Sequence, residues 1–179
     1  MFPTRSLATP AGMHHEVGLL FALLELTRKQ TRDLILGMST ADLDARVRGV
    51  PYSIANLLLH IAGVELHWVR RVLAGDEIDA GTREEFAGGD LGSIAAEQLK
   101  AKDAAYYLGV LDGVRAQTEA VCWKLKDHDL GVEKDDGRGG RCSVRWILGH
   151  LVDHEAHHRG QIRLIARLAG ATTRSTESA

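Results

Sequence analysis

Residues 150–162, HLVDHEAHHRGQI, place four histidines within nine positions of the chain. An α-helix turns by about 100° per residue, so all four imidazoles fall within a stripe roughly 100° wide. His154 and His158 project among the isoleucine, leucine and valine positions of this segment, whereas His150 and His157 lie toward the edge of that apolar face. The segment therefore predicts a helix with two imidazoles, one turn apart, pointing into the core.

The size and composition of the chain predict one domain. It has 179 residues, of which 45% are hydrophobic, and this is enough to bury a sizeable core. We expect a single domain over residues 1–179, with a core of about 14–168 and a polar tail at 171–179. The formal net charge of -2 gives no strong field to gather nucleic acid or an anionic membrane, so neither is an expected partner.

The cysteines and the N-terminal region favour a soluble, cytoplasmic protein. Cys122 and Cys142 form no CxxC motif and no dense disulfide framework, which fits a reducing compartment. The apolar stretch VGLLFALLEL follows Glu16 and is interrupted by Glu25. It is too short and too charged for a membrane span or a signal peptide.

Apolar residues recur every three or four positions in four blocks, and no segment shows the convincing alternation of a strand. Ser53 and Ser143 stand where helix N-caps are expected, and Gly75 and Gly170 follow the last turns of the second and fourth blocks. The pattern predicts an all-α protein, a four-helix bundle of up-down-down-up or related topology in which the second and fourth helices are neighbours. The blocks are residues 14–38, 53–73, 93–125 and 143–168.

The second and fourth blocks resemble each other at an offset of 90 residues. SIANLLLHIAGVELH begins at Ser53 and SVRWILGHLVDHEAH begins at Ser143, with Ser, Leu, His, Glu and His in step. Two amphipathic helices can match by chance. The alternative is a duplicated helical hairpin, which predicts a pseudo-twofold relation between the halves of the bundle and a site between them.

The histidine pair predicts a metal site. Neutral imidazoles at positions i and i+4 can bind one ion, although HxxxH lacks the glutamate of HExxH and is a weak motif alone. The second block offers His60, Glu65 or His67 as a third ligand, and the helical wheel leaves these alternatives open. Ligation by Glu65 suits iron or manganese, whereas three imidazoles suit zinc, nickel or copper.

The segments LLLHIAGVELHWVRR and LGHLVDHEAHHRGQI together resemble the DinB-like superfamily of bacterial four-helix metalloproteins, and HxxxHRGQ is the most specific part of the match. The resemblance covers nearly the whole chain. It implies that one histidine of the second helix and both histidines of HxxxH bind a divalent metal, zinc or nickel first. Those positions are His60, His154 and His158, and His150 and His157 are then not ligands.

Three protein ligands leave a coordination position open, as in catalytic sites. Some relatives in this superfamily are transferases or isomerases that use low-molecular-weight bacterial thiols such as mycothiol or bacillithiol. The resemblance thus implies a thiol-dependent S-transferase or isomerase acting on small electrophilic substrates, in a chain that forms a homodimer. The alternatives are a metal-dependent hydrolase and a non-catalytic metal-binding stress-response protein.

Three further residues have two interpretations each. Glu65 is a candidate catalytic base, or an acceptor for a histidine N–H, and its alternative role is an ion pair with an arginine. Arg159 and Gln161 belong to the HxxxHRGQ motif. For these two, hydrogen bonds that tie the last helix to its neighbours are favoured over contact with a substrate. The long connections at 75–92 and 126–142 are expected at the open end of the site, where loops often determine specificity.

Overall fold

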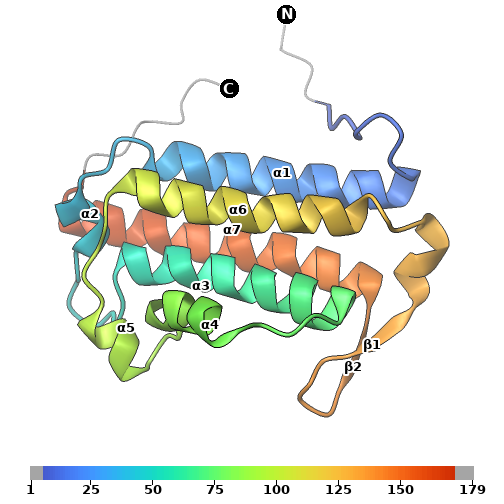
Figure 1. Cartoon of the computed structure of the whole chain (residues 1–179). Helices are drawn as coiled ribbons and strands as arrows, with labels where there is room; N and C mark the ends of the chain where they lie inside the picture. Colours follow the sequence, from blue (N-terminus) through green and yellow to red (C-terminus); the bar gives the residue numbers. More distant parts are fainter. Residues whose placement is uncertain (1–5, 172–179) are drawn as a thin grey trace, which may run out of the picture.

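Four long helices lie side by side in the computed structural model, which describes residues 6–171 (Figure 1). Traced by colour in Figure 1, the first and last helices run in one direction and the middle two in the other, which is the up-down-down-up topology. The second and fourth long helices pack against each other. The four-helix prediction is confirmed, and the predicted tail lies outside the described residues from 172 onward. The long helices are α1 (His15–Ile35), α3 (Ile54–Leu66), α6 (Ala104–Cys122) and α7 (Val144–Ala169).

Caps fix the ends of the two helices that carry the histidines. The Ser53 side chain accepts the backbone N–H of Asn56, and the Asn56 side chain accepts the backbone N–H of Ser53, which together form a capping box at the start of α3. Ser143, which aligns with Ser53 in the 90-residue repeat, caps the start of α7. The left-handed backbone of Gly170, with φ of 69°, ends α7 without the steric cost that a side chain would add there.

The third predicted helix is two helices, so its prediction as one segment over 93–125 was wrong. The helix α5 (Ile94–Gln98) ends because side chains occupy its last carbonyls: Asn56 and Arg46 donate to the carbonyl of Ala96. The chain then restarts at Asp103, whose carboxylate caps α6. This break leaves α5 packed against η2 and hydrogen-bonded to Asn56 at the start of α3.

The predicted connections contain short elements of their own. The π-helical segment η1 (His67–Ala74) continues α3, and the connection after it holds α4 (Ala80–Phe86) and the 3-10 turn η2 (Ala87–Gly89). The second connection forms a small antiparallel hairpin outside the core, with Lys134 opposite Cys142. The remaining elements are α2 (Thr40–Asp44), η3 (Asp127–Gly131), β1 (Glu133–Asp135) and β2 (Arg141–Ser143).

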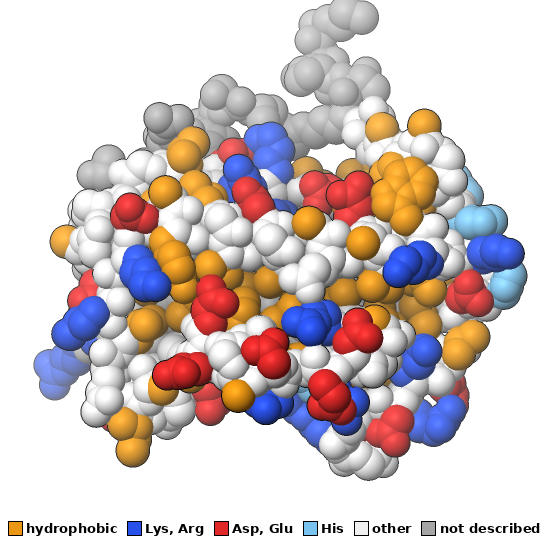
Figure 2. Space-filling view, viewed as in Figure 1, with side chains coloured by type: hydrophobic (Ala, Val, Ile, Leu, Met, Phe, Trp, Pro, Cys, Tyr) orange, Lys and Arg blue, Asp and Glu red, His pale blue; other side chains and the backbone are white. Residues whose placement is uncertain are grey.

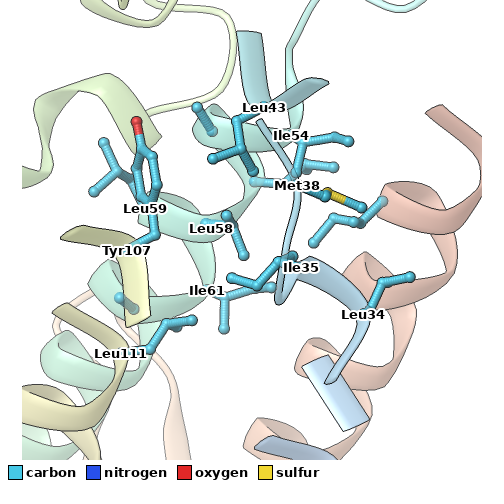
Figure 3. Close-up of a cluster of buried hydrophobic side chains, with 14 of the residues drawn as sticks. Leu34, Ile35, Met38, Leu43, Ile54, Leu58, Leu59, Ile61, Tyr107 and Leu111 are labelled. Atoms are coloured by element: carbon cyan, nitrogen blue, oxygen red, sulfur yellow. The ribbon is translucent and has the colours of Figure 1, made fainter. Parts of the chain in front are cut away.

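Two apolar clusters form the core at opposite ends of the bundle. One joins the end of α1, α2, α3, the start of α6 and the end of α7, and Figure 3 shows its buried leucine, isoleucine and tyrosine side chains. The other joins the start of α1, η1 and the start of α7. The face seen in Figure 2 carries interspersed basic and acidic side chains and a hydrophobic band between α6 and α4. Within residues 6–171, no helix has the length and apolar content needed to cross a membrane.

Buried charges separate the two clusters. Each long helix contributes one residue to this Arg/Glu layer, which consists of Arg28, Glu65, Arg115 and Glu155. Each arginine bonds both glutamates, at nitrogen–oxygen distances of 2.6 to 3.3 Å. Glu65 and Glu155 are the positions that the 90-residue repeat places in register, and their shared partners give the pseudo-twofold relation a structural counterpart.

Candidate metal centre

Three imidazoles converge between α3 and α7. His60 comes from the middle of α3, and His154 and His158 come from successive turns of α7. Their ligand nitrogens all lie within 4.8 Å of one another. The three residues, hereafter the histidine triad, are those that the family resemblance implied, and they could hold one metal ion.

Hydrogen bonds on the far side of the rings orient two of the imidazoles. His60 Nδ1 lies 2.9 Å from the carbonyl oxygen of Gly89, and His158 Nδ1 lies 2.6 Å from Gln161 Oε1. Both oxygens are acceptors, so each Nδ1 carries the proton and donates it. Each Nε2 of a neutral ring then has a free lone pair, which is the form that binds a metal.

The spacing of the nitrogens fits a shared ion. His154 Nε2 lies 3.2 Å from His60 Nε2. Two imidazole nitrogens bound to one ion at about 2.0 to 2.1 Å with a tetrahedral angle are roughly 3.3 Å apart. The spacing of this pair fits tetrahedral ligation, and with the third nitrogen within 4.8 Å the three histidines could hold one ion and leave a position open.

Gly89 makes the orientation of His60 possible because its backbone lies directly against α3. A Cβ atom added at Gly89 would stand 2.5 Å from the backbone nitrogen of His60 and 2.6 Å from the carbonyl carbon of Leu59. No side chain fits at that distance. The glycine thus allows η2 to pack on α3 closely enough for its carbonyl to reach the His60 ring.

The pKa values of all three imidazoles of the histidine triad are lowered, so the rings stay neutral. Burial, followed by the neighbouring imidazoles, lowers the pKa of His154 to about 3. Burial also lowers the pKa of His158 to about 4, although the hydrogen bond that His158 donates to Gln161 acts in the opposite direction, and burial lowers the pKa of His60. Neutral imidazoles with free lone pairs are ready ligands, because no proton has to leave before a metal binds.

The Glu65 carboxylate belongs to the Arg/Glu layer. It accepts hydrogen bonds from Arg28, Arg115 and Thr118. Burial alone would raise its pKa, but the two arginines and these hydrogen bonds lower it to about 2. This position supports the ion-pair interpretation, and the role of Glu65 as a catalytic base stays a prediction that the geometry does not favour.

The other histidines of the motif lie beside the histidine triad. His150 stacks on Trp146 with ring centroids 4.8 Å apart and planes 6° apart, and Trp68 packs edge-on against both rings. His157 is exposed and contacts His158 edge-on. Neither residue is in the group of converging ligand atoms found among residues 6–171.

A cavity of about 870 Å³ opens beside His60 and His154. Its volume lies in the range of small-molecule sites. One wall is Trp68 and Trp146, and the long connections at 75–92 and 126–142 contribute Phe86, Arg138 and other lining residues. Both connections therefore border the open side of the histidine triad, as expected from the sequence.

The other motif residues support α7. Arg159 donates to the Thr27 carbonyl of α1 at 3.3 Å, which ties the two helices together. Gln161 accepts from His158, as described above. Sequence reasoning missed Trp68, Trp146 and Gly89 as parts of the site. The 90-residue repeat could have pointed to Trp68. In the repeat, Trp68 aligns with His158 and His60 aligns with His150. In the structure, Trp68 packs on His150.

The DinB family model matches residues 13–178. Protein YkkA of Bacillus subtilis (strain 168), which is itself called uncharacterized, is 23% identical over 152 residues, or 84% of this chain and 86% of that protein. Two crystal structures share the fold at 18% identity. A conserved protein from Enterococcus faecalis gives a TM-score of 0.68 over 84% of this chain and 95% of its own. A DinB-like protein from Bacillus cereus ATCC 10987 gives 0.62 over 87% and 95%. Because the family model spans most of the chain, the protein belongs to the DinB family.

Proposed function

We propose that this protein is a divalent-metal-dependent enzyme that transfers a low-molecular-weight thiol to a small electrophile, or isomerises the electrophile through such an adduct. The observation that carries the proposal is the histidine triad, with ligand atoms within 4.8 Å of one another, at the side of an 870 Å³ cavity. A sealed structural site has no use for such an opening, whereas a catalytic site needs one. The thiol itself is suggested by the family resemblance.

The residues of the chain have separable roles in this proposal. The histidine triad would hold a zinc or nickel ion, Gly89 and Gln161 orient two of its rings, and the cavity admits the thiol and the electrophile together. The ion supplies a positive charge that lowers the pKa of a thiol bound beside it. In the transfer, a carbon–sulfur bond forms, the leaving group departs with its bonding electrons, and the thiol proton passes to solvent.

The decisive experiment begins with protein purified anaerobically without a histidine tag. Elemental analysis should find about one zinc or nickel per chain. The protein is then mixed with a bacterial thiol and a chromogenic electrophile such as 1-chloro-2,4-dinitrobenzene, and thioether formation is followed by absorbance and mass spectrometry. We expect a metal-dependent rate above that of the thiol alone, which chelation abolishes and added zinc or nickel restores.

The matched control is the His157→Ala variant, which removes an exposed imidazole from the same helix. It should keep the activity, whereas His154→Ala should lose it. Hydrolysis of activated esters without any thioether would contradict thiol transfer and favour a hydrolase. A tightly bound metal with no exchangeable water would contradict both enzymes and favour a non-catalytic metal-binding protein.

A further inference from the structure

An aromatic wall lies beside the histidine triad, within the same cavity. Trp146 is 49% exposed although it is a large apolar residue. Its ring is held by parallel stacking on His150 and by an edge contact with Trp68 at 5.6 Å. An exposed aromatic face in a concave site, fixed by two neighbouring rings, is suited to packing a flat apolar group.

Charged side chains of both connections line the cavity, among them Asp90, Asp136 and Arg138. Asp90 directly follows Gly89, whose carbonyl accepts a hydrogen bond from His60. Arg138 acts on His67, because burial and then the charge of Arg138 lower the pKa of that imidazole. The guanidinium of Arg138 therefore lies toward His67. Seven residues, or about 10 Å of helix, separate His60 from His67.

Arg138 is presented by the loop of the β1–β2 hairpin. The acidic neighbour in that loop, Asp136, uses Oδ1 to accept the backbone N–H groups of Arg138 and Gly140. Arg83 of α4, which donates to the Ile78 carbonyl, also lines the cavity. Two arginines, one from each long connection, thus line the same cavity as Trp146. Guanidinium groups of this kind recognise carboxylates.

We propose that the electrophilic substrate is a planar aromatic carboxylic acid whose ring packs on Trp146 and Trp68 and whose carboxylate binds Arg138, with Arg83 as the second cation. This inference rests on the proposed function and specifies its substrate class. The reactive atom then lies toward the histidine triad, at the far end of the molecule from the carboxylate. The cavity volume leaves room for a thiol beside such a ring.

The test measures binding, so it needs neither thiol nor turnover. Naphthalene-2-carboxylate and its neutral carboxamide are titrated into zinc-loaded protein by calorimetry. We expect the acid to bind more tightly than the amide. Arg138→Gln should weaken the acid about tenfold and leave the amide unchanged. Arg141→Gln is the matched control, because Arg141 lies on the same hairpin but pairs with Glu133, and it should change binding by less than about twofold.

The aromatic contact is tested with Trp146→Leu, which should weaken the acid and the amide alike by about fivefold. Its control is Trp123→Leu, since Trp123 is 44% exposed but lies outside this cavity. The titration is repeated on metal-free protein, where the preference for the acid should persist. If chelation removes that preference, the carboxylate binds the metal and the inference is overturned.

Equal binding of acid and amide, or equal effects of Arg138→Gln and Arg141→Gln, would also overturn it. These outcomes are distinct from failure of the proposed function. A protein that binds the acid as described, yet forms no thioether with any thiol, would contradict thiol transfer and leave the aromatic-acid site in place.

Discussion

The Arg/Glu layer and the histidine triad differ in how their charges are matched. In the Arg/Glu layer, two arginines face two glutamates and the buried charges cancel. In the histidine triad, three rings bring their ligand nitrogens within 4.8 Å of one another, and burial lowers the pKa of each ring so that the rings stay neutral. The first cluster is complete without any ligand. The second gains a positive charge only from outside the chain, and this difference separates a structural cluster from a binding site.

The largest effect should follow from unbalancing the Arg/Glu layer. Glu65→Gln removes one of the two buried negative charges opposite Arg28 and Arg115, and the third carboxylate, Glu25, is half-exposed and pairs only with Arg115, so the buried layer is left with excess positive charge. We expect the free energy of unfolding, measured with urea on metal-free protein at pH 7, to fall by about 3 to 5 kcal/mol. Glu133→Gln breaks only the exposed pair with Arg141 and should cost less than about 1 kcal/mol. Equal losses in the two variants would mean that the layer is not structural.

Removing a ligand from the histidine triad should weaken metal binding and leave the stability of the fold almost unchanged. His154→Ala or His158→Ala should weaken zinc binding by more than about 100-fold, since losing a direct ligand exceeds the usual loss from a supporting residue. The stability of the metal-free protein should barely change. His150→Ala and His157→Ala should weaken zinc binding by less than about tenfold, as measured by competition with a chelating dye. Equal losses of zinc affinity in all four variants would show that the ligands have been assigned to the wrong histidines.

A smaller effect is expected at the support of the histidine triad. Gly89→Ala forces η2 away from α3, because the new Cβ would overlap the backbone at Leu59 and His60. His60 then loses its hydrogen bond to the Gly89 carbonyl, and zinc affinity should fall by about 10 to 100-fold. Gly109→Ala is the control, since a Cβ there meets open space. If zinc affinity is unaltered by Gly89→Ala, the carbonyl does not orient the ligand.

The smallest expected effect is a change of stability with pH, which should differ between the histidine triad and the Arg/Glu layer. The folded pKa of His154 is about 3, below its ordinary value of 6.5, so below pH 6.5 the unfolded chain takes up a proton that the folded chain resists. The free energy of unfolding of metal-free wild type should therefore fall between pH 7.5 and pH 5.5. The fall should exceed that of the His154→Ala variant by about 1 kcal/mol, a figure reduced to allow for the partial solvent exposure of His154. Urea titrations at the two pH values check this.

Glu65 acts in a different window. Its folded pKa of about 2 lies below the ordinary 4.5, so its contribution is fully present above pH 4.5 and is lost as the pH falls toward 2. The difference between wild type and Glu65→Gln should hence stay constant from pH 7.5 to 5.5. A pH-dependent difference in that range would contradict the assignment of the two windows.

Local sequence pattern predicted the parts of the fold that local chemistry determines. The caps at Ser53 and Ser143 and the terminal Gly170 were visible because a cap needs only its own few residues. The break before α6 was not visible, since it depends on Arg46 and Asn56 reaching α5 from distant positions. The three-residue strands of the hairpin are too short and too exposed to alternate recognisably.

The site was predictable to a similar depth. The helical stripe selected His154 and His158, but angles alone could not choose among His60, Glu65 and His67, and the family resemblance supplied His60. The helical wheel placed Glu65 near the apolar face, where a metal ligand and a member of a buried ion pair occupy the same position and cannot be told apart. Its partners Arg28 and Arg115 come from helices far along the chain, and no local pattern contains that pairing.

The contact between Gly89 and His60 also has a thermodynamic consequence. Since η2 both borders the cavity and orients a ligand of the histidine triad, a molecule that shifts this turn on binding changes the affinity of the metal. Reciprocity then requires the metal to change the affinity of that molecule by the same factor. A ligand that moves η2 and an ion held by the histidine triad would thus be coupled through the Gly89 carbonyl, and the affinity of one would report the binding of the other.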